Sequence, residues 1–339
     1  MKLYVQKIIL QIKSIYQLPM FSKFFIFQLF CLLVLPFGAV AQLTATHEGI
    51  NRIDSLLAVP KSLNFLVIGD WGRNGYFHQQ DVADRMNEAA YQNEAAFIVS
   101  TGDNFYINGV ASVDDPLWLS SFENIYKGSE LQRDWFAVLG NHDYHGSVQA
   151  QIDYSKKSRR WRMLDRFYKV ERTLRDGSGE KILLLFIDSN PFQPAYTPVG
   201  YPDIAACDTA QQKAWIKNTL SKSNAKWKIV VGHHPLYSGG VRKGKTQDMA
   251  TAFEHLFETY KVDAYFCGHE HDLQHIRLKH THQFLSGAGS EVRPTGSTEG
   301  TLFSASVQGF MAVSATKEQL LVQVVDYKGN VLYRATLKK

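Results

Sequence analysis

Five apolar runs in this 339-residue chain end in the same way, and this shared ending constrains the fold more than any other feature. Each run leads through a glycine to an Asp, Asn or His, in the segments FLVIGDWG, FIVSTGDNFY, WFAVLGNHD, KIVVGHHP and AYFCGHEH. Short continuous apolar runs are typical of buried strands, and residues that follow parallel strands meet at the carboxyl edge of a sheet. We therefore expect an α/β fold that brings these polar side chains to one place.

The polar side chains at these endings form a candidate metal site, which comprises Asp70, Asp103, Tyr106, Asn141, His233, His269 and His271. Carboxylate, amide, phenol and imidazole groups suit borderline-to-hard divalent or trivalent ions. Two ions about 3.5–4 Å apart need a bridging carboxylate and several further ligands. A lone Asp or Asn after a strand is more often a turn or a helix cap, so the hypothesis rests on the ordered set.

Composition indicates a well-buried core, because 45% of the residues are hydrophobic and 13% are aromatic. The length allows one large domain or two ordinary ones. The net charge of +5 comes largely from residues 1–41, which contain four Lys and no acidic residue. Without them the chain has 33 basic and 32 acidic residues, so no excess of positive charge favours nucleic acid as a partner.

Residues 1–41 are predicted to be a signal peptide. An apolar stretch covers Phe24–Phe37, and Ala39-Val40-Ala41 provides a small-residue cleavage signal. The region before the apolar stretch is long, and Met20 is an alternative start of translation. An uncleaved membrane anchor is the alternative interpretation. We expect export, to a periplasm or by secretion, with residues 42–339 as one mature domain that does not associate with a membrane.

Two cysteines remain after the leader, Cys207 and Cys267. Nothing in the sequence supports a disulfide between them. We expect the fold to be held by its core and by its metals.

Strand-like and helix-like segments alternate along most of the chain. The expected strands are Phe65–Gly69, Phe97–Ser100, Phe136–Leu139, Ile182–Ile187, Ile229–Val231 and Ala264–Phe266. The expected helices are His78–Asn93, Pro116–Tyr126, a segment that begins at Asp208 and passes Leu220, and Met249–Tyr260. The last third has strand patterns at Phe284–Ser286, Phe310–Ala315, Leu320–Asp326 and Val331–Thr336, with a hairpin turn at Tyr327–Asn330.

The ordered blocks GDWG, GDNFY, GNHD, GHHP and GHEH resemble the signature of the calcineurin-like metallophosphoesterase superfamily. Tyr106, three residues after Asp103, narrows the resemblance to the purple acid phosphatases of the small, tartrate-resistant type. It extends from about Asn64 to Lys338 and includes SVQAQIDYSKKSRRW, CGHEHDLQ and LSGAG. The resemblance implies a four-layer αββα sandwich of two mixed β-sheets flanked by helices.

The resemblance also implies roles for the candidate site. A ferric ion is expected on Asp70, Tyr106 and His271, a divalent ion on Asn141, His233 and His269, and Asp103 is expected to bridge them. The divalent ion is expected to be Fe(II), Zn or Mn. A metal-bound hydroxide is expected to attack phosphate monoesters, and tyrosinate-to-Fe(III) charge transfer is expected to give colour.

His142 is the candidate catalytic residue that we do not assign to a metal. It follows Asn141, and it is expected to stabilise the pentacoordinate phosphorus or to protonate the leaving alcohol. Asp143 is a candidate to orient it. Glu270 and Asp272 are candidates to support the neighbouring imidazoles.

One loop departs from the family pattern. The small type commonly carries a second substrate-facing His after its GH-x-P block, but the loop Leu236–Gln247 contains none. His234 lies beside His233 instead, and Arg242, Lys243 and Lys245 add positive charge. Which of these groups contacts substrate is left open at this stage.

The sequence therefore predicts an exported acid phosphatase, monomeric and acting on small phosphorylated substrates. A phosphodiesterase or nucleotide pyrophosphatase of the same superfamily is one alternative. A non-catalytic surface protein that kept the fold is another.

Overall fold

The computed structural model describes residues 50–339, of which residues 52–339 form one compact unit. The predicted signal peptide, residues 1–41, lies outside the described residues. Within the described part of the chain, no helix is long and apolar enough to span a membrane.

Two seven-stranded sheets form the centre of the fold. The first has the order β14-β13-β12-β1-β2-β3-β4 and consists of β1 (Leu63–Ile68), β2 (Phe97–Ser100), β3 (Asp134–Ala137), β4 (Trp161–Arg162), β12 (Gly309–Ala315), β13 (Gln319–Asp326) and β14 (Val331–Lys338). The second has the order β11-β9-β10-β8-β7-β6-β5 and consists of β5 (Tyr168–Thr173), β6 (Lys181–Phe186), β7 (Trp227–Val231), β8 (Ala264–Cys267), β9 (Leu273–Ile276), β10 (His282–Ser286) and β11 (Thr301–Ala305).

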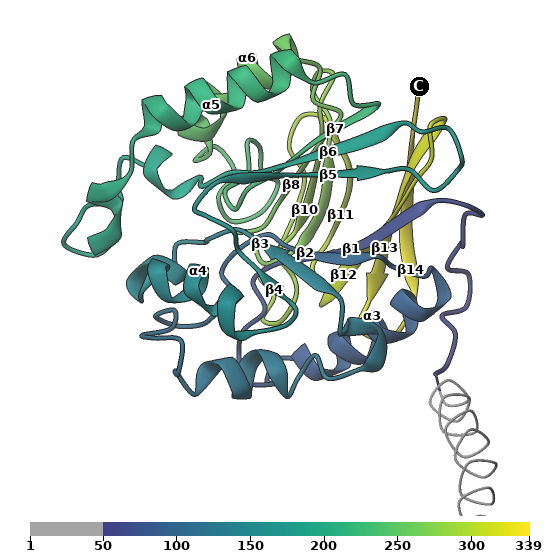
Figure 1. Cartoon of the computed structure of the whole chain (residues 1–339), viewed down its shortest axis with the longest axis horizontal. Coiled ribbons are helices and arrows are strands. Elements are labelled where there is room, and N and C mark those ends of the chain that lie inside the picture. Colours follow the sequence, from purple (N-terminus) through teal and green to yellow (C-terminus); the bar gives the residue numbers. More distant parts are fainter. Residues whose placement is uncertain (1–49) are drawn as a thin grey trace, which may run out of the picture. The chain divides into compact units, whose positions relative to one another are not determined.

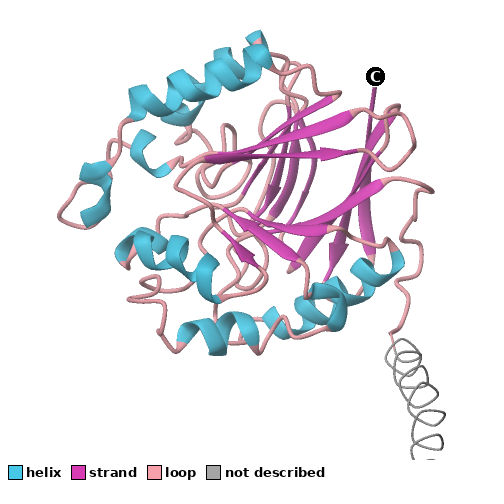
Figure 2. Cartoon of the chain, in the orientation of Figure 1, coloured by secondary structure: helices cyan, strands magenta, loops and turns pink. Residues whose placement is uncertain are grey.

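The helices lie outside the two sheets. They are α3 (Gln79–Gln92), α4 (Val148–Lys157), α5 (Thr209–Lys222) and α6 (Gln247–Thr259). Figure 1 shows the two sheets facing each other, with α5 and α6 on one outer side and α3 and α4 on the other. Figure 2 shows the same layers by type of element. Both sheets combine parallel and antiparallel pairs, so the predicted four-layer αββα sandwich is confirmed.

Strand β6 shows how one sequence serves two cores. Ile182, Leu184 and Phe186 belong to the core between the sheets, whereas Leu183 and Leu185 belong to the core under α5 and α6. Successive side chains of a strand point to opposite faces, so a strand covered on both faces must be apolar throughout. The apolar run at Ile182–Phe186 is continuous because both faces of the strand are buried.

The parallel strands determine where the polar endings meet. Strands β1 to β4 are mutually parallel in the first sheet, and β6, β7, β8 and β10 are parallel in the second. The loops after β1, β2, β3, β7 and β8 carry the candidate ligands. Parallel strands end on the same edge, so these loops gather at one end of the sandwich.

Several local expectations are corrected. The expected helix at Pro116–Tyr126 is a short π-helical turn at Trp118–Glu123. Helix α4 was not predicted, although Ser147 caps it by accepting a hydrogen bond from the Ala150 N–H. The cysteines, in contrast, agree with the sequence, in which nothing supported a disulfide: Cys207 and Cys267 are both free thiols.

Candidate metal centre

The structure brings all seven predicted side chains together, and they form two groups. In the first group, Tyr106 Oη lies 3.0 Å from Asp70 Oδ1 and 3.0 Å from His271 Nε2. In the second group, His233 Nε2 lies 3.3 Å from Asn141 Oδ1 and 3.1 Å from His269 Nδ1. Both groups offer oxygen or nitrogen donors within hydrogen-bond distance of one another.

Asp103 lies between these groups. Its Oδ2 is 3.2 Å from Tyr106 Oη and 3.4 Å from His233 Nε2. One carboxylate therefore reaches both groups, as a bridging ligand must.

Three of these residues adopt a left-handed backbone conformation. The φ angles are 58° at Asp70, 49° at Asp103 and 73° at His269. Such conformations cost about 1–3 kcal/mol for residues other than glycine and are concentrated at functional sites. The chain accepts this cost where each loop turns a side chain toward the centre.

The glycines of the GN and GH blocks are required by close packing at the same loops. A Cβ on Gly140 would lie 2.1 Å from Asp103 Oδ1, and one on Gly268 would lie 2.3 Å from Asp70 Oδ2. The repeated glycine in the sequence thus makes room for the candidate ligands.

The electrostatics of the site favour a bound cation. Burial raises the pKa of Asp70 well above its usual value. Burial also acts to raise the pKa of Asp103, but contacts with His233 and His142 together lower that pKa. Burial acts to lower the pKa of His233, and contacts with Asp103, Asp70 and Thr101 raise it to about 9, so the buried carboxylates favour a positive charge at this position. Metal ions would supply this charge directly, and oxygen and nitrogen donors fit them.

The environment of Tyr106 also favours a bound cation. Burial, followed by the charges of Asp103 and Asp70, raises the pKa of its phenol well above the usual value. A phenol in this position therefore ionises only beside a strong cation. A metal ion bound here would supply such a cation.

His142 lies beside the two groups. Its ring packs 4.5 Å from the ring of Tyr106, and its backbone N–H donates to Asp103 Oδ1 at 2.8 Å. The His142 Nδ1 lies 2.6 Å from the carbonyl oxygen of Ile107, so Nδ1 carries the donated proton. The Nε2 atom makes no hydrogen bond to the described residues and is free to face a substrate.

The expectation that Asp143 orients His142 is not supported by the hydrogen bonds. Asp143 is fully buried and accepts hydrogen bonds from the Gly140 N–H at 2.8 Å and from Gln151 Nε2 at 2.8 Å. It thereby fixes the loops that carry Asp103 and Asn141. The carbonyl of Ile107 orients the ring instead.

Glu270 and Asp272 do not hydrogen-bond the neighbouring imidazoles. Glu270 accepts from Ser238 Oγ at 2.9 Å, and Asp272 accepts from Gln274 Nε2 at 2.7 Å. They hold the loop that follows β8 rather than the rings.

His234 is already bonded at both ring nitrogens. Its Nδ1 lies 2.8 Å from Ser189 Oγ, and its Nε2 lies 2.9 Å from Tyr196 Oη. Burial lowers the pKa of this ring well below its usual value, so it is neutral. Although its ring lies 4.3 Å from that of His269, binding a metal or a substrate would require breaking one of these hydrogen bonds.

Ser189 was not singled out from the sequence. Its Oγ also accepts from the backbone N–H groups of His233 at 3.2 Å and His234 at 3.1 Å. The apolar run of β6 is followed by Asp188-Ser189-Asn190, so the strand-then-polar pattern was present but lacked the glycine.

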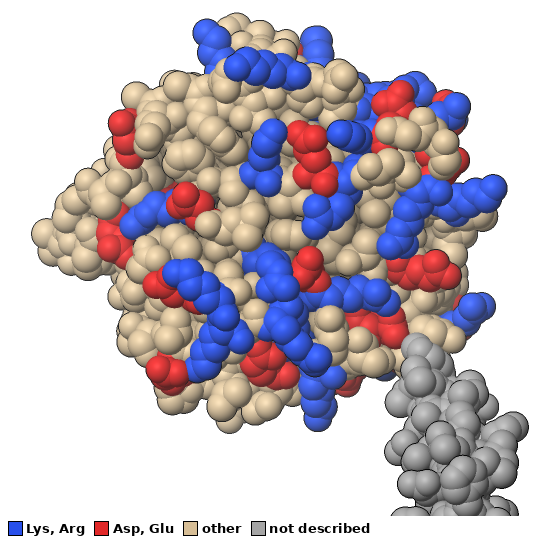
Figure 3. Space-filling view, in the orientation of Figure 1, with Lys and Arg blue, Asp and Glu red and all other residues tan. Residues whose placement is uncertain are grey.

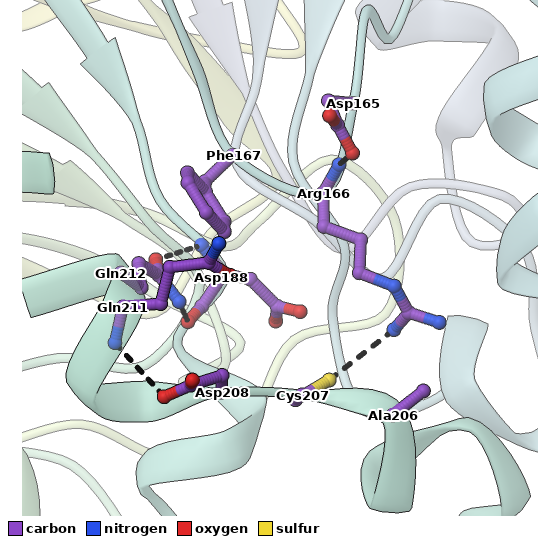
Figure 4. Close-up of a pocket in the computed structure, with 9 residues that line it drawn as sticks. All are labelled: Asp165, Arg166, Phe167, Asp188, Ala206, Cys207, Asp208, Gln211 and Gln212. Carbon is purple, nitrogen blue, oxygen red and sulfur yellow. Dashed lines mark hydrogen bonds between the residues drawn. The ribbon is translucent and has the colours of Figure 1, made fainter.

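A separate pocket of about 390 Å³ contains none of the candidate ligands. Figure 4 shows Arg166 pointing toward Cys207, with Asp188 between them and α5. The Arg166 Nη1 lies 3.3 Å from Cys207 Sγ. The molecular face in Figure 3 carries Lys and Arg interspersed with Asp and Glu, as expected from the 33 basic and 32 acidic residues of positions 42–339.

Comparison with known proteins agrees with this geometry. Residues 63–273 match the family described as calcineurin-like phosphoesterase. Purple acid phosphatase 4 of Arabidopsis thaliana is 38% identical over 291 residues, which cover 80% of this chain and 83% of that protein. Tartrate-resistant acid phosphatase type 5 of Sus scrofa is 32% identical over 336 residues, which cover 91% of this chain and 93% of that protein.

Among solved structures, one described as GAP50, the anchor in the inner membrane complex of Plasmodium, superposes with a TM-score of 0.73 at 25% identity. The match covers 82% of this chain and 89% of that chain. The chain belongs to the calcineurin-like phosphoesterases and, within them, to the purple acid phosphatases, enzymes that hydrolyse phosphate monoesters with a binuclear metal centre.

Proposed function

We propose that the protein is an exported acid phosphatase whose centre holds Fe(III) beside a second divalent ion, Fe(II), Zn or Mn. The observation that carries the proposal is the division of the site. Asp70, Tyr106 and His271 form one group, Asn141, His233 and His269 form the other, and Asp103 reaches both. The phenol in the first group favours Fe(III), and the neutral donors of the second group favour a divalent ion.

When bound, such a centre activates water and polarises a phosphate oxygen of the substrate. The residues of the chain supply the rest. Asp103 holds the two groups in register, and the Ile107 carbonyl keeps the His142 Nδ1 protonated. His142 Nε2 is then available to protonate the leaving alcohol or to stabilise negative charge on phosphorus.

One alternative is the role suggested by the similarity to GAP50, which is described as an anchor. A non-catalytic protein has no need to retain seven converging donors with three strained backbone positions. We therefore favour catalysis. A protein that binds no metal and hydrolyses no phosphoester would support the anchor role instead.

The central experiment is a visible absorption spectrum of the purified protein together with elemental analysis. We expect one iron with a second metal, and a broad tyrosinate-to-Fe(III) band. A colourless, iron-free but active enzyme would refute the iron assignment and leave phosphoester hydrolysis standing. Comparing p-nitrophenyl phosphate with bis-(p-nitrophenyl) phosphate separates a monoesterase from a phosphodiesterase.

Export and a monomeric state are also part of the proposal. Expression of the full chain should yield a protein outside the cytoplasm that begins at Gln42. Amino-terminal sequencing and the mass in solution test both points. A mature protein that retains residues 1–41 would favour the membrane-anchor alternative.

A further inference from the structure

Two arginines on neighbouring loops flank the candidate centre. Arg242 lies in the loop between β7 and α6, and Arg293 lies between β10 and β11. The loops touch, because Lys243 Nζ donates to the Ser297 carbonyl at 2.8 Å, and a Cβ on Gly239 would lie 2.7 Å from the Gly296 carbonyl oxygen. Both arginines therefore belong to one rim.

Arg242 is fixed beside His269. Its Nη1 donates to the His269 carbonyl at 3.1 Å, and its backbone N–H donates to Glu270 Oε1 at 2.6 Å. The side chain is 30% exposed, and its Nε and Nη2 atoms make no hydrogen bond to any described residue. The guanidinium is held in place while two of its nitrogens remain available.

The backbone of Arg293 is fixed beside His271. Its backbone N–H donates to the His271 carbonyl at 2.8 Å, and its own carbonyl accepts from Ser306 Oγ at 2.7 Å. Its guanidinium forms no ion pair or hydrogen bond within residues 50–339.

Nearby acidic groups do not fully neutralise this rim. Glu291 pairs with Arg73 at 2.6 Å, and Arg73 Cζ lies over the Tyr106 ring, 3.9 Å from its centroid. Glu270 Oε2 lies 3.7 Å from Arg242 Nη1 and balances that charge in part. Arg293 and the free face of Arg242 remain to attract an anion.

We propose that Arg242 and Arg293 form a second anion-binding subsite beside the metal centre. The subsite takes a carboxylate or phosphate on the alcohol part of a phosphate monoester, so that the enzyme prefers acidic over neutral leaving alcohols. A guanidinium suits both groups because its N–H donors match paired oxygens. The inference rests on the proposed phosphatase activity and adds its substrate class.

The test compares kcat/KM for matched substrates with the metal-loaded enzyme. Glycerol 3-phosphate and 3-phosphoglycerate differ by a carboxylate, and fructose 6-phosphate and fructose 1,6-bisphosphate differ by a phosphate. The wild type should prefer the substrate with the additional anionic group in at least one pair. The pair that shows this preference identifies whether the subsite takes a carboxylate or a phosphate. Arg242→Gln and Arg293→Gln should each reduce the preference about tenfold, the value of one charge-assisted hydrogen bond.

Three controls make the outcome decisive. Arg242→Lys should restore part of the preference. Lys245→Gln removes the same charge from the same loop, at a side chain that forms no hydrogen bond or ion pair within residues 50–339, and should leave the preference unchanged. Metal content and Tm identify variants that remain folded, and if one Gln variant fails, the other still tests the subsite.

Different outcomes would overturn the phosphatase activity and the anion subsite. An enzyme that hydrolyses neither p-nitrophenyl phosphate nor any of the four substrates would overturn the proposed function. Hydrolysis without a preference for charged leaving alcohols, or equal losses on charged and neutral substrates in both variants, would overturn the subsite alone.

Discussion

The Asp143 carboxylate accepts hydrogen bonds from both the backbone and the side chain of Asn104. The Asn104 N–H lies 3.0 and 3.1 Å from the two oxygens of Asp143, and Asn104 Nδ2 donates to Oδ2 at 3.1 Å. Asn104 directly follows Asp103, and Asp143 also accepts from the Gly140 N–H. One buried carboxylate thus fixes the distance between the loops after β2 and β3.

Replacing Asp143 with Ala should therefore destabilise the fold and release metal. Each buried donor left without a partner costs about 1–3 kcal/mol, so we expect the unfolding free energy to fall by roughly 3 kcal/mol. Thermal unfolding and elemental analysis measure the two effects. A variant with unchanged Tm and metal content but slow turnover would instead support the sequence-based expectation that Asp143 orients His142.

The sequence was sufficient to predict that the candidate ligands lie close together, because each follows a buried strand. The order of parallel strands within a sheet does not alter which edge they share. It was insufficient for Asp143 and Ser189, whose partners depend on how loops from separate strands pack. Strand β5 was missed for a related reason. Its pattern alternates between buried Tyr168 and Val170 and exposed Lys169 and Glu171, and it pairs only with β6 at the sheet edge.

His142→Ala should slow turnover and leave the metals in place. Loss of a general acid typically costs 10²–10⁴ in rate, and we expect about a hundredfold lower kcat with an alkyl phosphate. The loss should be smaller with p-nitrophenyl phosphate, whose leaving group needs little protonation. Equal losses on both substrates would favour stabilisation of charge on phosphorus over proton donation.

His145→Ala is the matched control for that variant, since the His145 ring lies 5.9 Å from the His142 ring and binds the Gly200 carbonyl at 2.8 Å. It should leave the substrate dependence unchanged. Loss of metal in His142→Ala would show that the ring supports the centre instead of the reaction.

Tyr106→Phe should abolish the visible band, because the phenol oxygen is the proposed charge-transfer donor. The change also removes contacts with Asp70 and His271, so iron content should fall. Tyr76→Phe, at a ring that is 71% exposed, controls for the loss of a phenol. An unchanged band in Tyr106→Phe would show that a group other than Tyr106 is the chromophore.

A pair formed by the buried His275 and the half-buried His282 should make stability depend on pH. His275 Nε2 lies 2.9 Å from His282 Nδ1. Burial, followed by the charge of His282, lowers the pKa of His275 from 6.5 to about 3; burial, followed by the charge of Arg277, lowers that of His282 to about 4. The unfolded chain therefore binds protons below about pH 6.5 that the folded chain does not, so stability should fall as the pH drops from 6.5 toward 4.

His282→Gln should make this fall shallower. Tm measured by circular dichroism between pH 4 and 7 tests it, with His255→Gln on the exposed side of α6 as the control. An equal pH dependence in wild type and His282→Gln would show that the carboxylates, not this pair, control acid stability.

Gly140→Ala tests whether the shared glycine exists to make room for a ligand. The added Cβ would lie 2.1 Å from Asp103 Oδ1 and 2.2 Å from the Asp103 backbone nitrogen, and the backbone nitrogen cannot yield as a flexible side chain can. Displacing Asp103 by about 1 Å should lower kcat/KM roughly a hundredfold and reduce the metal content. Gly200→Ala, where the new Cβ meets nothing within 4 Å, should leave both unchanged. Full metal occupancy in Gly140→Ala would mean that the loop can relax, and that the glycine serves the turn and not the carboxylate.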